Sequence, residues 1–234
     1  MEPRRAAQRD AQRGAGAERV APRHVDRIAG ARLQGGRVVD VDIVDGVVVA
    51  VTDAGATEPT GGSVIDACGY MVLTAPAEPH AHLDKALSWG ATRPPGCDLG
   101  AAIDAWRAYA ATVDEDEIHA RALAAARKIV ANGTTAVRSH VDLHDDHDPL
   151  RGVRALVRVR DELAGVMDLQ ISVMVNEVDP ADRARAAIAA GADLIGGAPH
   201  ISTDPVSETH RLVDLAEELG TGIDLHVDEV LDGD

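Results

Sequence analysis

Two histidines one residue apart, His80 and His82, are the residues of this sequence best suited to chemistry. They lie just past the apolar run 70–77, at the end of a predicted strand. Side chains alternate along an extended chain, so both imidazoles point the same way and can bind one metal ion. Zinc and ferrous iron both accept imidazole ligands, and a catalytic site keeps a position open for water. Such a pair can also be merely solvated or hydrogen-bonded, so the rest of the chain has to decide.

Polar side chains recur where the later strands are predicted to end. Short apolar runs at 134–141, 169–175, 194–199 and 222–227 alternate with helix-length segments, which is typical of a parallel sheet covered by helices. Polar residues at the strand ends are typical of a (β/α)8 barrel with its active site at the C-terminal face. A doubly wound sheet is the alternative, but no Gly-rich phosphate turn follows the first strand. The strand-end residues are His140 and Asp142, Asn176 and Glu177, His200, and His226 with Asp228 and Glu229.

Four helices are predicted between these strands. Three of them share an Asp N-cap, a Pro at the first helical position and a Gly beyond the end. These segments run from Asp148 to Gly165, from Asp179 to Gly191 and from Asp204 to Gly220. The fourth helix precedes them, and it is predicted to start at a capping box over 112–115.

Three parts of the chain differ in character. Residues 1–25 lack apolar periodicity and are predicted to be a disordered tail. Residues 26–70 alternate like strands, with a hairpin turn at Asp45-Gly46, and predict a small β-sandwich-type domain. Residues 71–234 hold about five strand–helix units, whereas a whole barrel needs eight units and about 250 residues. We therefore expect an incomplete barrel from a truncated form, or one piece, of a longer protein, because its end strands would otherwise be unpaired edges.

Composition narrows the classes of function. The 234 residues carry a formal charge of −16, which disfavours nucleic-acid binding because phosphate contacts need a basic face. No apolar run approaches the roughly 20 residues of a membrane span. The two cysteines, Cys68 and Cys97, imply no disulfide framework. We expect a cytoplasmic protein that acts on a small molecule.

His226 and Glu229 add a third imidazole and a carboxylate to the same predicted edge. His80, His82 and His226 can then bind one metal ion, with Glu229 above it. A metal ion lowers the pKa of water, and a nearby carboxylate can carry that proton to a leaving nitrogen. This combination predicts hydrolysis, and the alternative is that His226 and Glu229 only hydrogen-bond in a loop.

Three segments in order, 72–85, 132–142 and 224–229, resemble the amidohydrolase superfamily, and within it the bacterial cytosine deaminase branch. The likeness runs from about Arg27 to the last residue. It implies that the metal ligands are His80, His82 and His226, and that Glu229 shuttles the proton and contacts the substrate ring.

The resemblance assigns further roles. Asn176 matches a glutamine that binds the pyrimidine in cytosine deaminase. The side chain of Asn is one methylene shorter, so the identity of the substrate ring stays open. His140 and Asp142 are implied to support the metal ligands, with a packed hydrogen-bonded pair as the alternative. His200 either lines the pocket or is structural. The remaining histidines are expected to have no catalytic role: His24, His119, His144, His147 and His210.

The resemblance also implies the number of metal ions. Binuclear members of the superfamily use a carboxylated lysine on the fourth strand, and the lysines here are Lys85 and Lys128. One divalent ion is therefore implied, either Zn²⁺ or Fe²⁺.

The implied reaction is hydrolysis of a C–N bond in a small nitrogen heterocycle, releasing ammonia or an amine. Deamination is favoured over ring opening by the spacing of His226 and Glu229, while isopropylaminotriazine, creatinine and pterin substrates stay open. In the family the sixth strand brings another histidine and the eighth an aspartate that binds the metal and activates the water. This sequence ends before both, so we expect little or no activity from this chain alone. The alternative class is a non-catalytic protein, either a degenerate product or one piece of a split enzyme. The expected protein partner is a second copy or a complementing C-terminal chain.

Overall fold

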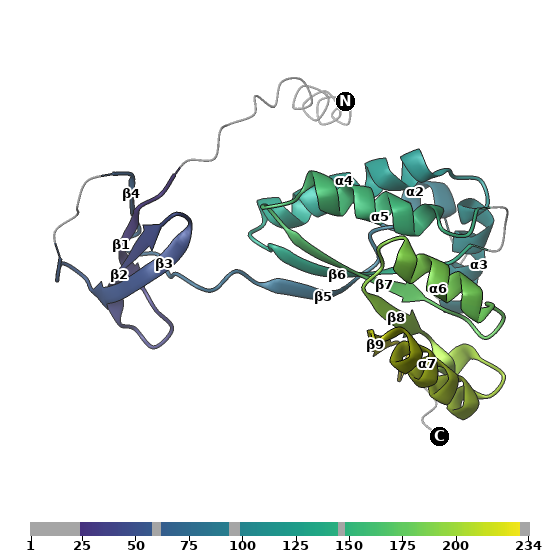
Figure 1. Cartoon of the computed structure of the whole chain (residues 1–234). Helices are drawn as coiled ribbons and strands as arrows, with labels where there is room; N and C mark the ends of the chain where they lie inside the picture. Colours follow the sequence, from purple (N-terminus) through teal and green to yellow (C-terminus); the bar gives the residue numbers. More distant parts are fainter. Residues whose placement is uncertain (1–23, 58–61, 94–98, 145–147, 230–234) are drawn as a thin grey trace, which may run out of the picture. The chain divides into compact units, whose positions relative to one another are not determined.

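The computed structural model describes residues 24–57, 62–93, 99–144 and 148–229, so nearly all of the predicted tail lies outside the described residues. The chain divides into two compact units, Met1–Thr74 and Ala75–Asp234. Each unit is built on a sheet of its own (Figure 1). Within the described ranges, no helix is long and apolar enough to cross a bilayer.

The first unit contains a four-stranded mixed sheet in the order β3-β2-β1-β4. Asp45 and Gly46 have φ values of 52° and 78°, which confirms the predicted two-residue hairpin turn. The first strand was not predicted, because Gly30 (φ 69°) lies at an irregularity in its pairing and interrupts the alternating pattern. The strands are β1 (Arg27–Arg32), β2 (Val38–Val44), β3 (Val47–Asp53) and β4 (Val64–Asp66).

The second unit contains a five-stranded parallel sheet in the order β5-β6-β7-β8-β9, so strands adjacent in sequence are neighbours in space. The sheet curls into a half-barrel, and helices lie along its outer face (Figure 1). This confirms the predicted incomplete (β/α)8 barrel of about five strands, preceded by a small β layer. The strands are β5 (Ala77–Ala81), β6 (Ala136–Asp142), β7 (Asp168–Met174), β8 (Leu194–Gly197) and β9 (Gly222–Leu225).

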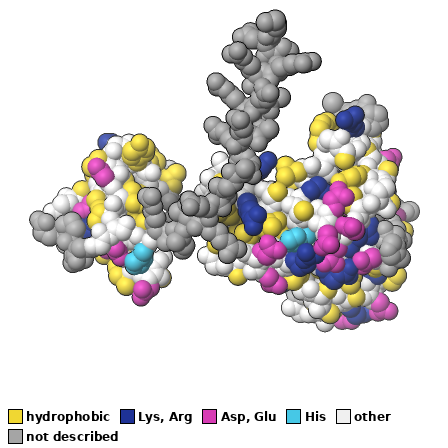
Figure 2. Space-filling view, turned by 90° about the horizontal axis from the view of Figure 1, so that it is seen from above, with side chains coloured by type: hydrophobic (Ala, Val, Ile, Leu, Met, Phe, Trp, Pro, Cys, Tyr) yellow, Lys and Arg dark blue, Asp and Glu magenta, His cyan; other side chains and the backbone are white. Residues whose placement is uncertain are grey.

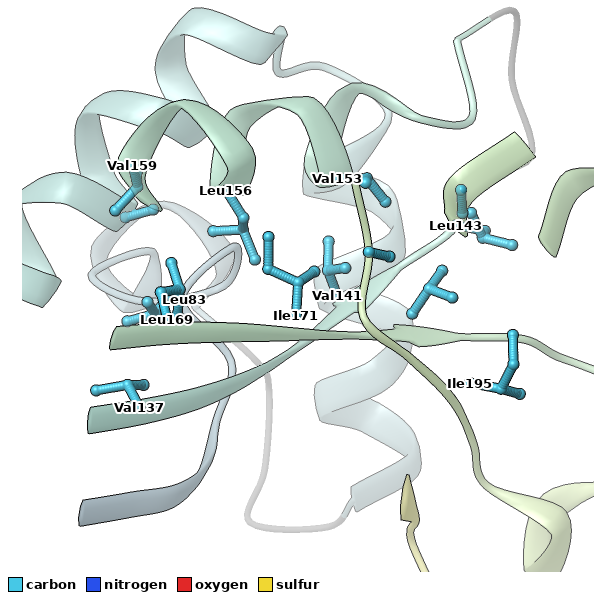
Figure 3. Packing of buried hydrophobic residues seen from close by; sticks show 14 of the residues in the cluster. Leu83, Val137, Val141, Leu143, Val153, Leu156, Val159, Leu169, Ile171 and Ile195 are labelled. Atoms are coloured by element: carbon cyan, nitrogen blue, oxygen red, sulfur yellow. The ribbon is translucent and has the colours of Figure 1, made fainter. Parts of the chain in front are cut away.

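The helices of this unit are α2 (Trp89–Thr92), α3 (Leu99–Ala110), α4 (Glu115–Ala131), α5 (Arg151–Glu162), α6 (Ala181–Ala189) and α7 (Pro205–Leu219), with the 3-10 turn η1 (Pro199–Ile201). The core lies between these helices and the sheet. Figure 3 shows side chains of α5 packed over β6 and β7. Leu156 of α5 and Ile171 of β7 are both fully buried there. This packing holds the strand ends, which carry the polar residues.

The first barrel strand lies later than predicted. β5 begins at Ala77 and ends at Ala81, so the two histidines lie at a strand end as predicted, but the strand does not include the rest of the apolar run 70–77. The predicted start was wrong because Met71 pairs with Arg32 of the first unit, and Pro76 has no amide hydrogen to donate to a sheet. Leu73 is 67% exposed, so the apolar character of this run does not reflect burial.

Helix boundaries agree with prediction at α7. The Asp204 side chain accepts a hydrogen bond from the Ser207 amide, and Gly220 ends the helix with φ 64°. At α4 the N-cap is Asp114, which accepts from the Glu117 amide, so the predicted capping box at 112–115 is two residues early.

Two other helices start later than their Asp-Pro signals. Arg151 begins α5, and Ala181 begins α6. The side chain of Asp179 accepts a hydrogen bond from the Asn176 amide, so it holds the loop and does not cap the helix. Helices α2 and α3 were not predicted at all.

Candidate metal centre

Four histidines meet at the carboxyl ends of three strands of the half-barrel. His80 lies within β5, and His82 is the first residue after that strand. His140 lies in β6, and His226 is the first residue after β9. One ring nitrogen from each can be chosen so that all four lie within 4.8 Å of one another. The structure thus brings together the three predicted ligands and adds His140 as a fourth imidazole.

The spacing of these rings suits a metal ion. Nε2 of His82 lies 3.1 Å from Nε2 of His226, and two nitrogens bound tetrahedrally at about 2.05 Å would lie about 3.3 Å apart. The His80 ring centroid is 4.5 Å from those of His140 and His226. Both ring nitrogens of His140 are buried and lack a hydrogen bond among the described residues, the nearest carboxylate being that of Asp224 at 3.6 Å from Nε2. Buried polar atoms without partners indicate a bound group, and the donor set fits a divalent cation.

Their surroundings favour the neutral form of His82, His140 and His226, which is the form that binds metal. Burial, aided by the charge of Lys85, lowers the pKa of His82 to about 3. Burial and the neighbouring His226 lower the pKa of His140 to about 4. The pKa of His226 is also lowered, mainly by burial and then by His80.

The backbone around His226 explains how the predicted metal ligand and the predicted proton shuttle share one loop. The His226 amide donates to the Gly197 carbonyl at 2.8 Å, which continues the pairing of β8 and β9 past the end of β9. Asp228 then adopts a left-handed conformation with φ 58°, which Asp tolerates better than most residues. This turn lets Glu229 line the same cavity as His226.

His200, from η1, connects this loop to the strand end before it. Its Nδ1 lies 3.1 Å from the His226 carbonyl oxygen, and its Nε2 lies 3.4 Å from Oε2 of Glu229. A carbonyl only accepts, so Nδ1 donates, and Nε2 then carries a proton only in the imidazolium form. His200 thus places a ring nitrogen next to the Glu229 carboxylate.

A cavity of about 450 Å³ opens beside the histidines. The main chain of Asn176 is fixed at its wall, because its amide donates to Asp179 and its carbonyl accepts from Arg211. His144, which was expected to have no catalytic role, also lines the cavity, whereas His147 lies outside the described residues. The polar wall comprises His82, Lys85, Trp106, Arg107, Asp142, His144, Arg151, Asn176, His200, His226 and Glu229.

Asp142 and His140 contact different groups. Asp142 lies 2.9 Å from Nζ of Lys85 and accepts from the Trp106 indole at 2.8 Å. His140 has Asp224 as its neighbouring carboxylate, at 3.6 Å. Sequence reasoning gave no role to Lys85, Trp106 or Asp224. The position of Lys85 three residues after His82 was a usable signal, whereas Trp106 lies on the unpredicted helix α3.

Fold and site together define a half-barrel of (β/α)8 type with a histidine cluster at its carboxyl edge. No family model matches the chain. It is 29% identical to a pterin deaminase of Rhizobium rhizogenes over 82% of this chain and 45% of the relative. Among solved structures, it resembles 5-methylcytosine deaminase from Klebsiella pneumoniae, with a TM-score of 0.78 and 32% identity over 88% of this chain and 52% of the other. N-isopropylammelide isopropylaminohydrolase from Burkholderia multivorans gives a TM-score of 0.74 and 32% identity over 86% and 52%.

These relatives place the chain in the amidohydrolase superfamily, as the sequence resemblance predicted. The chain spans about half the length of each of these three relatives.

Proposed function

We propose that this chain carries the metal site of a hydrolase that cleaves an exocyclic C–N bond of a small nitrogen heterocycle, releasing ammonia or an amine. The observation that carries the proposal is the cluster of four imidazoles, His80, His82, His140 and His226, of which His82 and His226 also line a cavity that holds Glu229 and Asn176. The three relatives are named for removal of an amino or isopropylamino group, which supports this reaction class.

In this proposal His80, His82 and His226 hold one divalent ion, Zn²⁺ or Fe²⁺. When bound, the ion supplies Lewis acidity that makes water a nucleophile near neutral pH. Because burial keeps the imidazoles of His82 and His226 neutral, they need not lose a proton before they bind the ion. His140 and Asp142 support the site from β6.

Glu229 is the proton carrier of the proposed reaction. Its carboxylate lines the cavity, where it can take a proton from water, and it lies beside His200. Delivery of that proton to the leaving nitrogen turns a poor leaving group into ammonia or an amine. Asn176, on the cavity wall, hydrogen-bonds the ring and orients it.

The test is ring binding to the Co²⁺-loaded chain, because the visible absorption of protein-bound cobalt reports changes around the ion. We expect 5-fluorocytosine to shift this spectrum and to give a calorimetric binding signal. His226→Asn should lose both effects together with the metal. A chain that binds cobalt tightly, yet shows neither a spectral shift nor heat with amino-substituted heterocycles, would be a non-catalytic metal protein and would contradict the proposal.

A further inference from the structure

Lys85 is a cation in the wall of the cavity, three residues after the metal ligand His82. Its side chain is 29% exposed, although most lysines are largely solvent-exposed. The chain has two lysines and a net charge of −16, so a lysine beside the metal centre is not the result of a generally basic surface. The visible face of the larger unit carries interspersed acidic and basic side chains (Figure 2).

Two neighbours fix the position of the Lys85 ammonium. Nζ lies 2.9 Å from Oδ1 of Asp142 and 5.8 Å from the centroid of the Trp106 ring. The other oxygen of Asp142 accepts a hydrogen bond from the Trp106 indole at 2.8 Å. Asp142 thus ties β6 to α3 and holds the lysine between them. An ammonium has three donors, and the bond to Asp142 uses one of them, which leaves donors for a group in the cavity.

The ammonium stays charged in this position. Burial alone would lower the pKa of Lys85, but the carboxylates of Asp142 and Asp84 outweigh it, and the pKa is raised. The charge also reaches the metal site, because it contributes to the lowered pKa values of His82 and His226. A molecule in contact with these histidines therefore also meets the field of Lys85.

We propose that Lys85 binds an oxygen atom of the substrate, so that the chain selects heterocycles that carry a carbonyl or anionic oxygen as well as the leaving amine. This inference rests on the proposed function. An ammonium only donates hydrogen bonds, so it repels the leaving amino group and suits an oxygen on another edge of the ring. Asp142 and Trp106 hold the ammonium in place before the ring arrives, which reduces the entropy lost on binding. The competing explanation is a purely structural ion pair between Lys85 and Asp142.

The experiment compares two rings that differ by one oxygen. The metal-loaded full chain is titrated calorimetrically with cytosine, which carries a ring carbonyl, and with 4-aminopyrimidine, which does not. A hydrogen bond to a charged group corresponds to about 10- to 100-fold in affinity. We expect the wild type to prefer cytosine by at least about 10-fold, and Lys85→Met to bind both rings with similar affinity while its metal content is unchanged. Lys85→Arg should restore part of the preference.

Lys128→Met is the matched control, because Lys128 is the other lysine of the chain and is exposed at the end of α4. It should keep the wild-type preference. Equal binding of both rings by the wild type, or an unchanged preference in Lys85→Met, would overturn the role of Lys85 and leave the proposed function standing. If the metal-loaded wild type binds neither ring, the proposed function fails, and the role of Lys85 fails with it.

Discussion

Replacing Asp142 with asparagine should destabilise the larger unit through the loss of one charge. The 2.9 Å pair with Lys85 is partly buried, since the two side chains are 29% and 24% exposed. Removing one partner of a fully buried pair costs about 3–5 kcal/mol, and an exposed pair contributes about 0–1 kcal/mol. With about three quarters of each side chain buried, we expect Asp142→Asn to lower the free energy of unfolding by about 2–3 kcal/mol. The midpoint temperature should fall by roughly 4–12 °C.

The assay is urea unfolding of chelator-treated protein followed by tryptophan emission. Both tryptophans, Trp89 and Trp106, lie in the larger unit, so the emission reports its unfolding separately from the smaller unit. The double variant Lys85→Met, Asp142→Asn leaves no unpaired ammonium. It should therefore be more stable than the sum of the single changes predicts, by about 1–2 kcal/mol. A coupling free energy below about 0.5 kcal/mol would refute the idea that Asp142 holds Lys85 in place.

Three further predictions concern the metal ligands, the buried histidines and the core. His226→Asn should weaken Zn²⁺ binding by more than about 100-fold in competition with a chromophoric chelator, since even outer partners of metal ligands change affinity 10- to 100-fold, and an unchanged affinity would exclude His226 as a ligand. Metal-free protein should become less stable as the pH falls from 6.5 to about 4, because His82 and His140, with folded pKa values of about 3 and 4, take up protons mainly when unfolded. Burial raises the pKa of Asp84 to about 7, so this group takes up a proton mainly in the folded state and offsets the uptake by one of the two histidines. A urea midpoint at pH 5 that is no lower than at pH 7 would argue against neutral buried imidazoles. Leu156→Ala should cost about 2–5 kcal/mol in the same unfolding assay, because Leu156 is fully buried between α5 and the sheet, whereas a loss below about 1 kcal/mol would contradict that packing.

The repeated strand–helix units were predictable because parallel strands buried on both faces leave strong local signals. Apolar runs located both ends of each strand from β6 to β9 to within two residues. The same reasoning failed at residues 70–77, where the side chains of Tyr70, Met71 and Leu73 are exposed. Composition alone cannot separate a buried strand from an exposed extended segment, since both can be rich in Val, Leu and Met.

The site was predictable where its chemistry follows strand ends. His80, His82, His226 and Glu229 were named from their positions alone. The structure places the three histidines in one cluster and Glu229 in the wall of the adjoining cavity. Whether they bind metal and move protons stays a prediction.

The part that sequence reasoning missed depends on contacts distant in sequence. Lys85 meets Asp142 across 57 positions, and Trp106 meets Asp142 across 36. No periodicity within one segment encodes such contacts. Helix α3, which supplies Trp106, has no Asp-Pro start signal and was therefore overlooked.

The most direct test of the proposed metal site is to measure how much metal the chain binds and which atoms surround it. The full chain is loaded with Zn²⁺, freed of excess metal, and measured by elemental analysis and X-ray absorption. We expect one zinc per chain, bound only by nitrogen and oxygen ligands at about 2.0–2.1 Å. The triple variant His80→Asn, His82→Asn, His226→Asn should lose the metal. Retention of zinc by the triple variant, or a sulfur shell at about 2.3 Å, would contradict this expectation.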